Sequence, residues 1–224
     1  MNILALDTST EYCFLALRLD GKTLVRDVLA GQRHSELLLP LLDDMLAEAG
    51  MRLTDLGGIA FGNGPGSFTG LRIACGVAQG LALGAGLPVA GVSTLLALAE
   101  GCGGERAVAC LDARMGEVYH AAYEKRGGEW QTVSEPGLYA PGSVPSLDGG
   151  GWVACGSGFA QHGEELLERY AGQVARVDAD LLPRAEFIAR LAAPVFAAGR
   201  GADAAEALPL YIRDKVALKT SERI

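Results

Sequence analysis

Residues 57–94, GGIAFGNGPGSFTGLRIACGVAQGLALGAGLPVAGVST, are the stretch around which this 224-residue chain is organised. The stretch predicts a short apolar strand over 59–61, a glycine-rich turn over 62–66, and a helix that begins near Ser67 or Thr69. Glycine allows the positive φ values and close backbone contacts of a sharp strand-to-helix turn. The two hydroxyls are suited to cap the free N–H groups of the first helical turn.

The predicted helix carries Gly76, Gly80 and Gly84 at four-residue spacing, which places three bare backbone patches on one face. Each glycine inside a helix costs roughly 0.5–1 kcal/mol relative to alanine, so we expect close packing of another helix as compensation. The preceding turn lacks the Gly-Lys-Ser/Thr of a P-loop and the glycine spacing of a dinucleotide-binding fingerprint. We therefore interpret the turn as structural rather than as a phosphate site.

The composition is that of an acidic globular protein. Half of the residues are apolar and 21% are charged, so the chain can bury a sizeable core. A formal net charge of −8 argues against unaided nucleic-acid binding. Gln79 and Pro88 lie within the apolar run over 73–92 and Arg72 directly precedes it, which favours a buried helix over a membrane span. The N-terminus has no basic signal-peptide start, and the five cysteines are scattered, so we expect a cytoplasmic protein with no membrane association.

The first thirty residues predict a three-stranded meander, with strands over 2–6, 13–19 and 22–29. Its first turn, formed by Asp7, Thr8, Ser9 and Thr10, holds one carboxylate and three hydroxyls. Such a turn either lines a nucleotide cleft or simply satisfies its own amides. Local sequence favours the second interpretation.

A second helix is predicted over 35–49, with Ser35 as N-cap, Gly50 as its stop and a kink at Pro40. Its leucines and methionine cover an arc of roughly 200°, whereas packing on one side needs only about 100°. The excess predicts a second apolar contact, with another helix of this chain or with a different protein.

The second half of the chain repeats the plan of the first. The run GCGGE at 101–105 predicts a domain boundary, and Asp112 ends a strand as Asp7 ends the first one. An internal duplication is the natural inference. Further strands are predicted over 106–112, 117–125, 130–134, 152–155 and 174–177, with a loop-rich segment over 136–151 and a helix over 160–170.

We expect three parts in the chain: an N-terminal lobe over 1–101, a smaller lobe over 102–182, and a C-terminal segment over 183–224. The last part contains an apolar helix over 184–199 that is expected to return to the first lobe. The tail LPLYIRDKVALKT, at 208–220, is expected to be extended.

Five segments, in order over essentially the whole chain, resemble one family: ALDTST, RHSELLLPLL, GNGPGSFTGLRIACGVAQGLA, DARMGEVYHA and LPLYIRDKVA. They are similar to the TsaB (YeaZ) family of bacterial tRNA threonylcarbamoyladenosine biosynthesis proteins, and GPGSFTGLRIA and DARMGEVY are long, specific matches. The resemblance implies an α/β fold of the actin/Hsp70/sugar-kinase (ASKHA) type, with two duplicated ribonuclease-H-like lobes and a cleft between them.

The resemblance also implies a function. Members help to place the threonylcarbamoyl group on N6 of adenosine 37 in tRNAs that read codons beginning with A. They act with the catalytic paralogue TsaD and the ATPase TsaE, and contact tRNA only through the complex. It implies no intrinsic cofactor, with ATP or ADP present only in the assembled complex, and a homodimer when the protein is isolated.

The resemblance bears on catalysis as well. The catalytic paralogue carries Asn-His-x-x-Gly-His after the strand that follows its glycine-rich helix, and those histidines bind the metal. Here Thr94 and Leu98 occupy the two histidine positions. Leucine cannot coordinate a metal, and one threonine hydroxyl cannot replace two imidazoles. We therefore expect no catalytic residue and no metal site.

What remains is a surface for a partner. In the family, two helices of the first lobe form a helical bundle with the equivalent helices of the partner. Carried over here, the contact residues are Ser35, Leu38, Leu41, Leu42, Met45, Thr69, Arg72, Ile73, Gly76, Gly80 and Leu83. Leu38→Arg or Gly80→Leu is then expected to weaken association while the monomer stays folded.

The alternative from another class is a nucleotide-binding enzyme of kinase or hydrolase type that uses the inter-lobe cleft. Its candidate residues are Asp7, Thr8, Ser9, Thr10, Asp112 and Arg114, because such an enzyme needs a carboxylate to hold Mg²⁺ or position a nucleophile. The one candidate for an adenosine-side loop is the weak glycine pattern at 156–158. A basic strip that touches tRNA is also considered, but solvated surface is the safer interpretation for Arg106, Arg114, Lys125, Arg126, Lys215 and Lys219.

Overall fold

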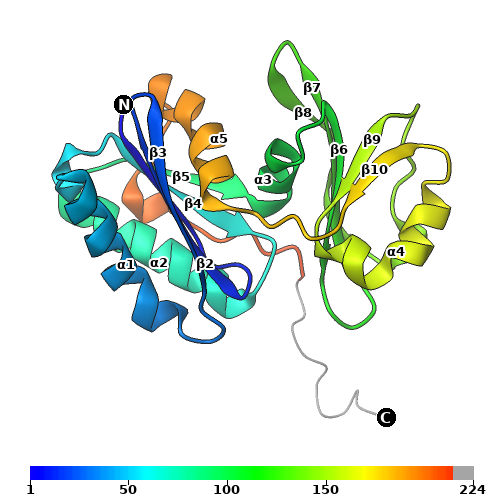
Figure 1. Ribbon diagram of the computed structural model, residues 1–224, viewed down its shortest axis with the longest axis horizontal. Coiled ribbons are helices and arrows are strands. Elements are labelled where there is room, and N and C mark those ends of the chain that lie inside the picture. Colours follow the sequence, from blue (N-terminus) through cyan, green and yellow to red (C-terminus); the bar gives the residue numbers. More distant parts are fainter. Residues whose placement is uncertain (214–224) are drawn as a thin grey trace.

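The computed structural model describes residues 1–213, which form two lobes, each built on a five-stranded sheet (Figure 1). The strands of the first sheet are β1 (Ile3–Asp7), β2 (Tyr12–Leu19), β3 (Lys22–Leu29), β4 (Gly58–Gly64) and β5 (Val89–Ser93). Those of the second sheet are β6 (Arg106–Asp112), β7 (Val118–Arg126), β8 (Glu129–Tyr139), β9 (Trp152–Cys155) and β10 (Val174–Asp178).

The two sheets have the same topology. The first is ordered β3-β2-β1-β4-β5, and the second, read from its other edge, is β8-β7-β6-β9-β10. In each lobe the first three strands are antiparallel, the fourth pairs in parallel with the first, and the fifth pairs in parallel with the fourth. The duplicated α/β architecture predicted from the sequence is thereby confirmed.

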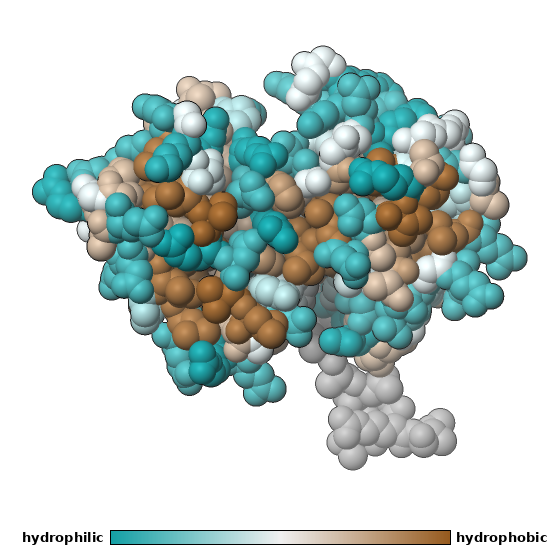
Figure 2. Space-filling view, in the orientation of Figure 1, coloured by the Kyte–Doolittle hydropathy of each residue, from teal (hydrophilic) through white to brown (hydrophobic). Residues whose placement is uncertain are grey.

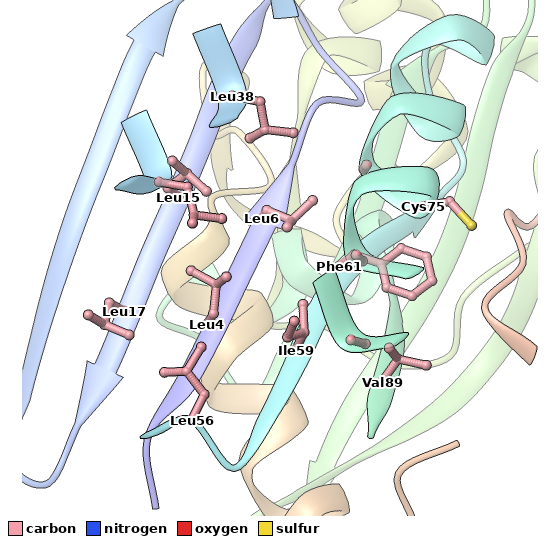
Figure 3. Close-up of a cluster of buried hydrophobic side chains, with 14 of the residues drawn as sticks. Leu4, Leu6, Leu15, Leu17, Leu38, Leu56, Ile59, Phe61, Cys75 and Val89 are labelled. Atoms are coloured by element: carbon pink, nitrogen blue, oxygen red, sulfur yellow. The ribbon is translucent and has the colours of Figure 1, made fainter. Parts of the chain in front are cut away.

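Helices cover both faces of the first sheet. Helices α1 (His34–Ala49) and α2 (Phe68–Ala85) pack on one face, and α5 (Ala185–Ala197) returns from the end of the second lobe to cover the other. Figure 3 shows the cluster under α1 and α2, where Leu38 and Cys75 meet Leu6 and Phe61 from the strands. Burial of this apolar face fixes which side of each helix is left outward.

Two further helices belong to the lobe junction and to the second sheet. Helix α3 (Thr94–Gly101) contacts both β6 and α5, so it lies between the lobes. Helix α4 (Ser157–Arg169) packs on β6 in the second lobe. Its buried side chains join a cluster with Trp152 and Tyr170.

Helix α1 was predicted with an N-cap at Ser35, a kink at Pro40 and an end at Gly50. The helix ends at Gly50 in a left-handed conformation, as expected. It begins at His34, with Arg33 at the N-cap, so Ser35 is not the cap; the His34 ring nitrogen Nε2 instead lies 3.1 Å from the carbonyl oxygen of Tyr12. Pro40, the position of the predicted kink, lies inside this one continuous helix.

The predicted loop after residue 135 also needs correction. Strand β8 continues through Pro136 to Tyr139, well beyond the predicted end at 134. Proline is tolerated there because β8 is an edge strand, so a missing N–H need not break a ladder on its open side. The tail predicted over 208–220 lies partly outside the described residues, as do Lys215 and Lys219.

Helix α2 is, among residues 1–213, the one helix long and apolar enough to cross a membrane by length and composition. Its inner side chains, which include Leu71, Ala74, Ala78 and Ala82, are buried on the first sheet. One face of α2 therefore packs on the sheet of this chain, and the opposite face of α2 points away from it.

Replacing Leu38 by alanine is expected to lower the free energy of unfolding by about 2–5 kcal/mol, because its side chain is 1% exposed within the core under α1. The matched control is Leu39→Ala on the same helix turn, where the side chain is 46% exposed and a change within about 0.5 kcal/mol is expected. Urea unfolding followed by circular dichroism measures both. Equal losses in the two variants would contradict the assigned burial.

Candidate partner-docking face and inter-lobe cleft

The outward face of α2 is built from small, polar and apolar residues. Ile73 is half-buried, and the other predicted contact residues on α2 are exposed: Thr69, Arg72, Gly76, Gly80 and Leu83. We call this set, together with Gly84, the α2 face. A Cβ atom added at Gly76, Gly80 or Gly84 would meet nothing within 4 Å among the described residues. The close helix packing expected from the glycine spacing is therefore not supplied by the described part of this chain.

Figure 2 shows hydrophobic surface gathered over the region of α1 and α2, at the lower left of this view. On α1, Leu39 is exposed and Leu41 is half-buried, while on α2 Leu83 is 74% exposed. An exposed apolar surface on a helix pair is typical of a protein–protein interaction site.

The α1 half of the predicted contact set needs correction. Leu38, Leu42 and Met45 are buried in the core of this chain, so their side chains are not available to a partner in this structure. Leu38→Arg would place a charge in that core, and the expectation that this variant stays folded does not hold. Ser35 is exposed and Leu41 half-buried. The wide leucine arc does continue outward, but through Leu39 and Leu41.

The turn before α2 places the helix by close backbone contact. The Ser67 hydroxyl accepts a hydrogen bond from the Gly70 N–H at 3.3 Å and caps the helix. A Cβ atom at Gly70 would lie 1.8 Å from the Thr8 carbonyl oxygen, and one at Gly66 would lie 2.7 Å from the Ser9 Cβ. Only glycine fits at these contacts, which supports the structural interpretation of the turn.

A cluster of aromatic and cationic side chains at the start of α2 was not predicted from the sequence. The Arg72 guanidinium lies 3.7 Å from the centroid of the Phe68 ring, and its Nε donates to the Tyr211 hydroxyl at 2.9 Å. The Phe68 and Tyr211 rings are 5.4 Å apart. Tyr211 belongs to the tail, 139 residues along the chain from Arg72, so no local pattern pairs the two.

A cleft of about 1030 Å³ lies between the lobes. Four of the six predicted cleft residues line it: Ser9, Thr10, Asp112 and Arg114. Asp7 and Thr8 do not: both are fully buried, Thr8 against Gly70 in the first turn of α2 and the Asp7 carboxylate against Gly62 of β4. The structure therefore brings the two predicted loops to one cleft but leaves only one of the two carboxylates there.

Asp7 is fully buried at the end of β1. Its Oδ1 accepts hydrogen bonds from the backbone N–H and the hydroxyl of Ser9, at 2.9 and 2.8 Å. Its Oδ2 has no partner among the described residues and lies where a side chain of Gly62 would begin. Burial raises the pKa of Asp7 to about 7, against the smaller lowering by the two Ser9 bonds. Thr8 is likewise turned inward, with its hydroxyl donating to the Gly70 carbonyl at 2.6 Å.

The Asp112 carboxylate interacts with residues of the turn that follows it. Its Oδ1 accepts from the Arg114 N–H at 3.0 Å, and its Oδ2 lies 3.2 Å from the Arg114 guanidinium. The backbone N–H of Asp112 donates to the Ser157 hydroxyl at 3.1 Å. His162 Nε2 lies 3.6 Å from Oδ1, too far for a hydrogen bond.

The second glycine pattern, at 156–158, is also a packing device. A Cβ atom at Gly156 would lie 2.5 Å from the Cys110 carbonyl oxygen, and one at Gly158 would lie 2.6 Å from the Cys110 Cβ. These glycines allow α4 to approach β6 closely. Close packing is therefore sufficient to explain the two glycines, and Ser157 between them lines the cleft.

The two positions that would carry metal-binding histidines are part of the core. Thr94 and Leu98 are both fully buried; the Thr94 hydroxyl donates to the Pro65 carbonyl, and Leu98 packs with Leu95 and other apolar residues of the lobe junction. Within residues 1–213, no group of three His, Cys, Asp or Glu side chains is arranged to hold a metal ion. The five cysteines are free and buried.

The basic residues of the second lobe do not form an unpaired strip. Arg106 and Arg126 both pair with Glu124, at 2.8 and 2.7 Å, and Lys125 pairs with Glu100 at 3.1 Å. These pairs offset much of the positive charge that a tRNA backbone would need. Arg114 is exposed but is paired with Asp112.

Comparisons with known proteins agree with this geometry. The family model described as "TsaD: tRNA N6-adenosine threonylcarbamoyltransferase" matches residues 27–218. The tRNA threonylcarbamoyladenosine biosynthesis protein TsaB of Escherichia coli (strain K12) is 41% identical, over 98% of this chain and 97% of that protein. The protein of the same name from Haemophilus influenzae is 34% identical, over 98% and 96%. The solved structure "YeaZ from Pseudomonas aeruginosa" has a TM-score of 0.86 at 41% identity, covering 94% of this chain and 99% of that one.

Two duplicated α/β lobes with a cleft between them define a protein of the actin/Hsp70/sugar-kinase-like class. Within that class, the full-length matches are decisive, since they cover nearly all of this chain and of each relative. The chain belongs to the TsaB (YeaZ) family.

Replacing Asp7 by asparagine is expected to flatten the dependence of stability on pH. Because the pKa of Asp7 rises from 3.8 to about 7 on folding, the native state holds a proton that the unfolded state releases in that interval. The free energy of unfolding of the wild type should therefore fall as pH rises from about 4 to 7, by up to about 1.4 kcal/mol per pH unit. Urea unfolding at a series of pH values compares the two proteins. Parallel curves would rule out a proton on Asp7 in the folded protein.

Proposed function

We propose that this protein is the non-catalytic partner subunit of a tRNA threonylcarbamoyltransferase complex. In this role it acts with a TsaD-type catalytic paralogue and a TsaE-type ATPase to form threonylcarbamoyladenosine at position 37 of tRNAs that read codons beginning with A. It meets tRNA only through the complex. The observation that carries the proposal is the outward, glycine-lined α2 face on a chain that belongs to the TsaB family.

The absence of catalysis in this subunit rests on the chemistry of two positions. The threonine and leucine at 94 and 98 are both fully buried, the threonine hydroxyl donates to the Pro65 carbonyl, and a leucine side chain has no atom that can ligate a metal. The inward position of Asp7 further weakens the kinase or hydrolase alternative, because it removes one of the two carboxylates on which that mechanism depends.

The docking role rests on energetics. Three glycines inside α2 lower its intrinsic stability by roughly 0.5–1 kcal/mol each. The described part of the chain packs nothing against them, so a partner helix that approaches the bare backbone would supply the missing contacts. A TsaD-type paralogue shares this fold and offers equivalent helices, which favours a pseudo-symmetric helical bundle.

The same face supports self-association of the isolated protein. An apolar, self-complementary helix surface is the usual basis of a two-fold homodimer. Because the homodimer and the heterodimer would use the α2 face, the two assemblies are mutually exclusive in this proposal. ATP or ADP would enter only with the assembled complex, where the partner supplies groups that the cleft of this chain lacks.

Replacing Gly80 by leucine is expected to weaken association with a TsaD-type partner by about tenfold or more, which corresponds to about 1.4 kcal/mol. The isolated monomer should be equally stable or more stable, since leucine favours a helix more than glycine does and the site is open. The matched control is Gly163→Leu on α4, where an added side chain also meets nothing within 4 Å. Isothermal titration calorimetry with the purified partner measures affinity. If Gly80→Leu and Gly163→Leu bound the partner with equal affinity, the α2 face would be excluded as the docking site.

Reconstitution tests the function itself. The purified TsaD-type and TsaE-type proteins, threonylcarbamoyl-adenylate, ATP and unmodified tRNA are incubated with and without this protein, and modified nucleosides are measured by mass spectrometry. The proposal expects product only when all three proteins are present. Product formed at the same rate without this protein, or formed by this protein alone, would refute it.

A further inference from the structure

The described end of the chain, residues 207–213, forms a segment that we call the strap. It follows α5 and runs from the first lobe to the second (Figure 1, orange-red). The Leu210 N–H donates to the Asn63 carbonyl oxygen at 2.6 Å, at the end of β4, and the Cys75 thiol of α2 donates to the Ala207 carbonyl at 3.2 Å. The beginning of the strap is therefore attached to the first lobe.

Tyr211 adds a third attachment to the first lobe. Its hydroxyl accepts from Arg72 Nε, and its ring packs near that of Phe68 at the start of α2. The backbone of the strap also passes close to the turn before α2, since a Cβ atom at Gly64 would lie 2.8 Å from the Leu210 carbonyl oxygen. Up to Tyr211 the strap is therefore attached to the first lobe, beside α2.

Arg213 then crosses to the second lobe. Its Nη2 donates to the Ala113 carbonyl oxygen at 3.0 Å and lies 2.8 Å from Glu117 Oε2, and its Nη1 lies 3.6 Å from the Met115 sulfur. All three partners belong to the turn between β6 and β7. The Arg213 side chain is only 15% exposed and lines the inter-lobe cleft.

The turn that receives Arg213 has an unusual backbone. Arg114 and Met115 have φ values of 62° and 57°, and Gly116 follows at 73°, so three consecutive residues are left-handed. Non-glycine residues hold such values only where their surroundings fix them. The Asp112 carboxylate holds the turn from within, and Arg213 holds it from the first lobe.

The other connection between the lobes lies on α3. Glu100 accepts from the Trp130 indole N–H at 2.8 Å and pairs with Lys125 at 3.1 Å, both in the second lobe. Arg190 of α5 lies 3.9 Å from the same carboxylate. The chain also passes between the lobes here, through 101–106 and 178–185. The lobes are thus joined on one side by α3, through Glu100 and the apolar packing of Leu95 and Leu98 on the second sheet, and again, across the cleft, at Arg213.

We propose that the strap is an inter-lobe latch, in which Arg213 holds the β6–β7 turn at its present distance from α2 and so sets the width of the cleft. With the Arg213 contacts removed, the lobes keep their connection through α3 and Glu100 and rotate about this junction, which widens the cleft. The inference is independent of the partner and of the proposed function, because it concerns the isolated chain.

Distance measurement across the cleft tests the latch on the full-length chain. Glu36 on α1 and Glu164 on α4 are exposed, and both are replaced by cysteine and labelled with nitroxides. The native cysteines are buried, so the protein without the added cysteines should take up no label. Double electron–electron resonance then gives the distribution of distances between the labels. Far-UV circular dichroism verifies that each variant is folded.

Arg213→Ala is expected to shift the distribution to a longer mean distance and to broaden it. The matched control is Arg52→Ala, which removes an arginine–carboxylate pair with Asp55 inside the first lobe and should leave the distribution unchanged. If Arg213→Ala does not fold, Glu117→Gln tests the proposal instead. This variant weakens the ion pair between Arg213 and Glu117 and should shift the mean distance in the same direction by a smaller amount. A folded latch variant with the distribution of the Arg52→Ala control would overturn the proposal.

Discussion

The structure depends on one close contact, between the first turn of α2 and the loop after β1. At Gly70 the backbone of α2 comes so near the Thr8 carbonyl oxygen that any side chain would collide with it. The Thr8 hydroxyl completes the contact by donating to the Gly70 carbonyl. This contact fixes where α2 begins and how it is rotated on the sheet.

That rotation has two consequences. It turns Leu71, Ala74, Ala78 and Ala82 inward and leaves the glycine stripe outward. It also covers Thr8, the residue after Asp7, whose own carboxylate is buried against Gly62 of β4. The same contact thus leaves the α2 face outward and turns the Thr8 side chain away from the cleft. In the function that we propose, a scaffold of the sugar-kinase type serves a partner instead of a substrate.

Sequence patterns predicted most of the fold, because they are local. The strand, glycine turn and helix over 57–94, the Asp-Gly hairpin and the repeated strand plan of the second half each depend on neighbouring residues. The patterns that failed required knowledge of tertiary position. A helix period shows that the leucines of α1 span a wide arc, but not which part of the arc faces the sheet, so Leu38, Leu42 and Met45 were placed on the wrong side. Pro136 predicts a loop unless its strand is known to be an edge.

The candidate site was predictable to a similar degree. The glycine stripe of the α2 face follows from glycine spacing, the other residues of that face were carried over from the family resemblance, and the cleft residues Ser9, Thr10, Asp112 and Arg114 follow from the two strand-ending turns. The burial of Asp7 does not, because it results from contact with residues about sixty positions later in the chain. Tyr211 and Arg213 could not be assigned for the same reason, since their partners lie about one hundred residues or more away.

Hydrogen–deuterium exchange on this protein, alone and saturated with a TsaD-type paralogue, tests the central claim most directly. The account predicts slower exchange of the backbone amides along α2, and no change in α4, which occupies the corresponding place in the second lobe. Protection confined to α4 or to the second sheet, with α2 unchanged, would contradict it.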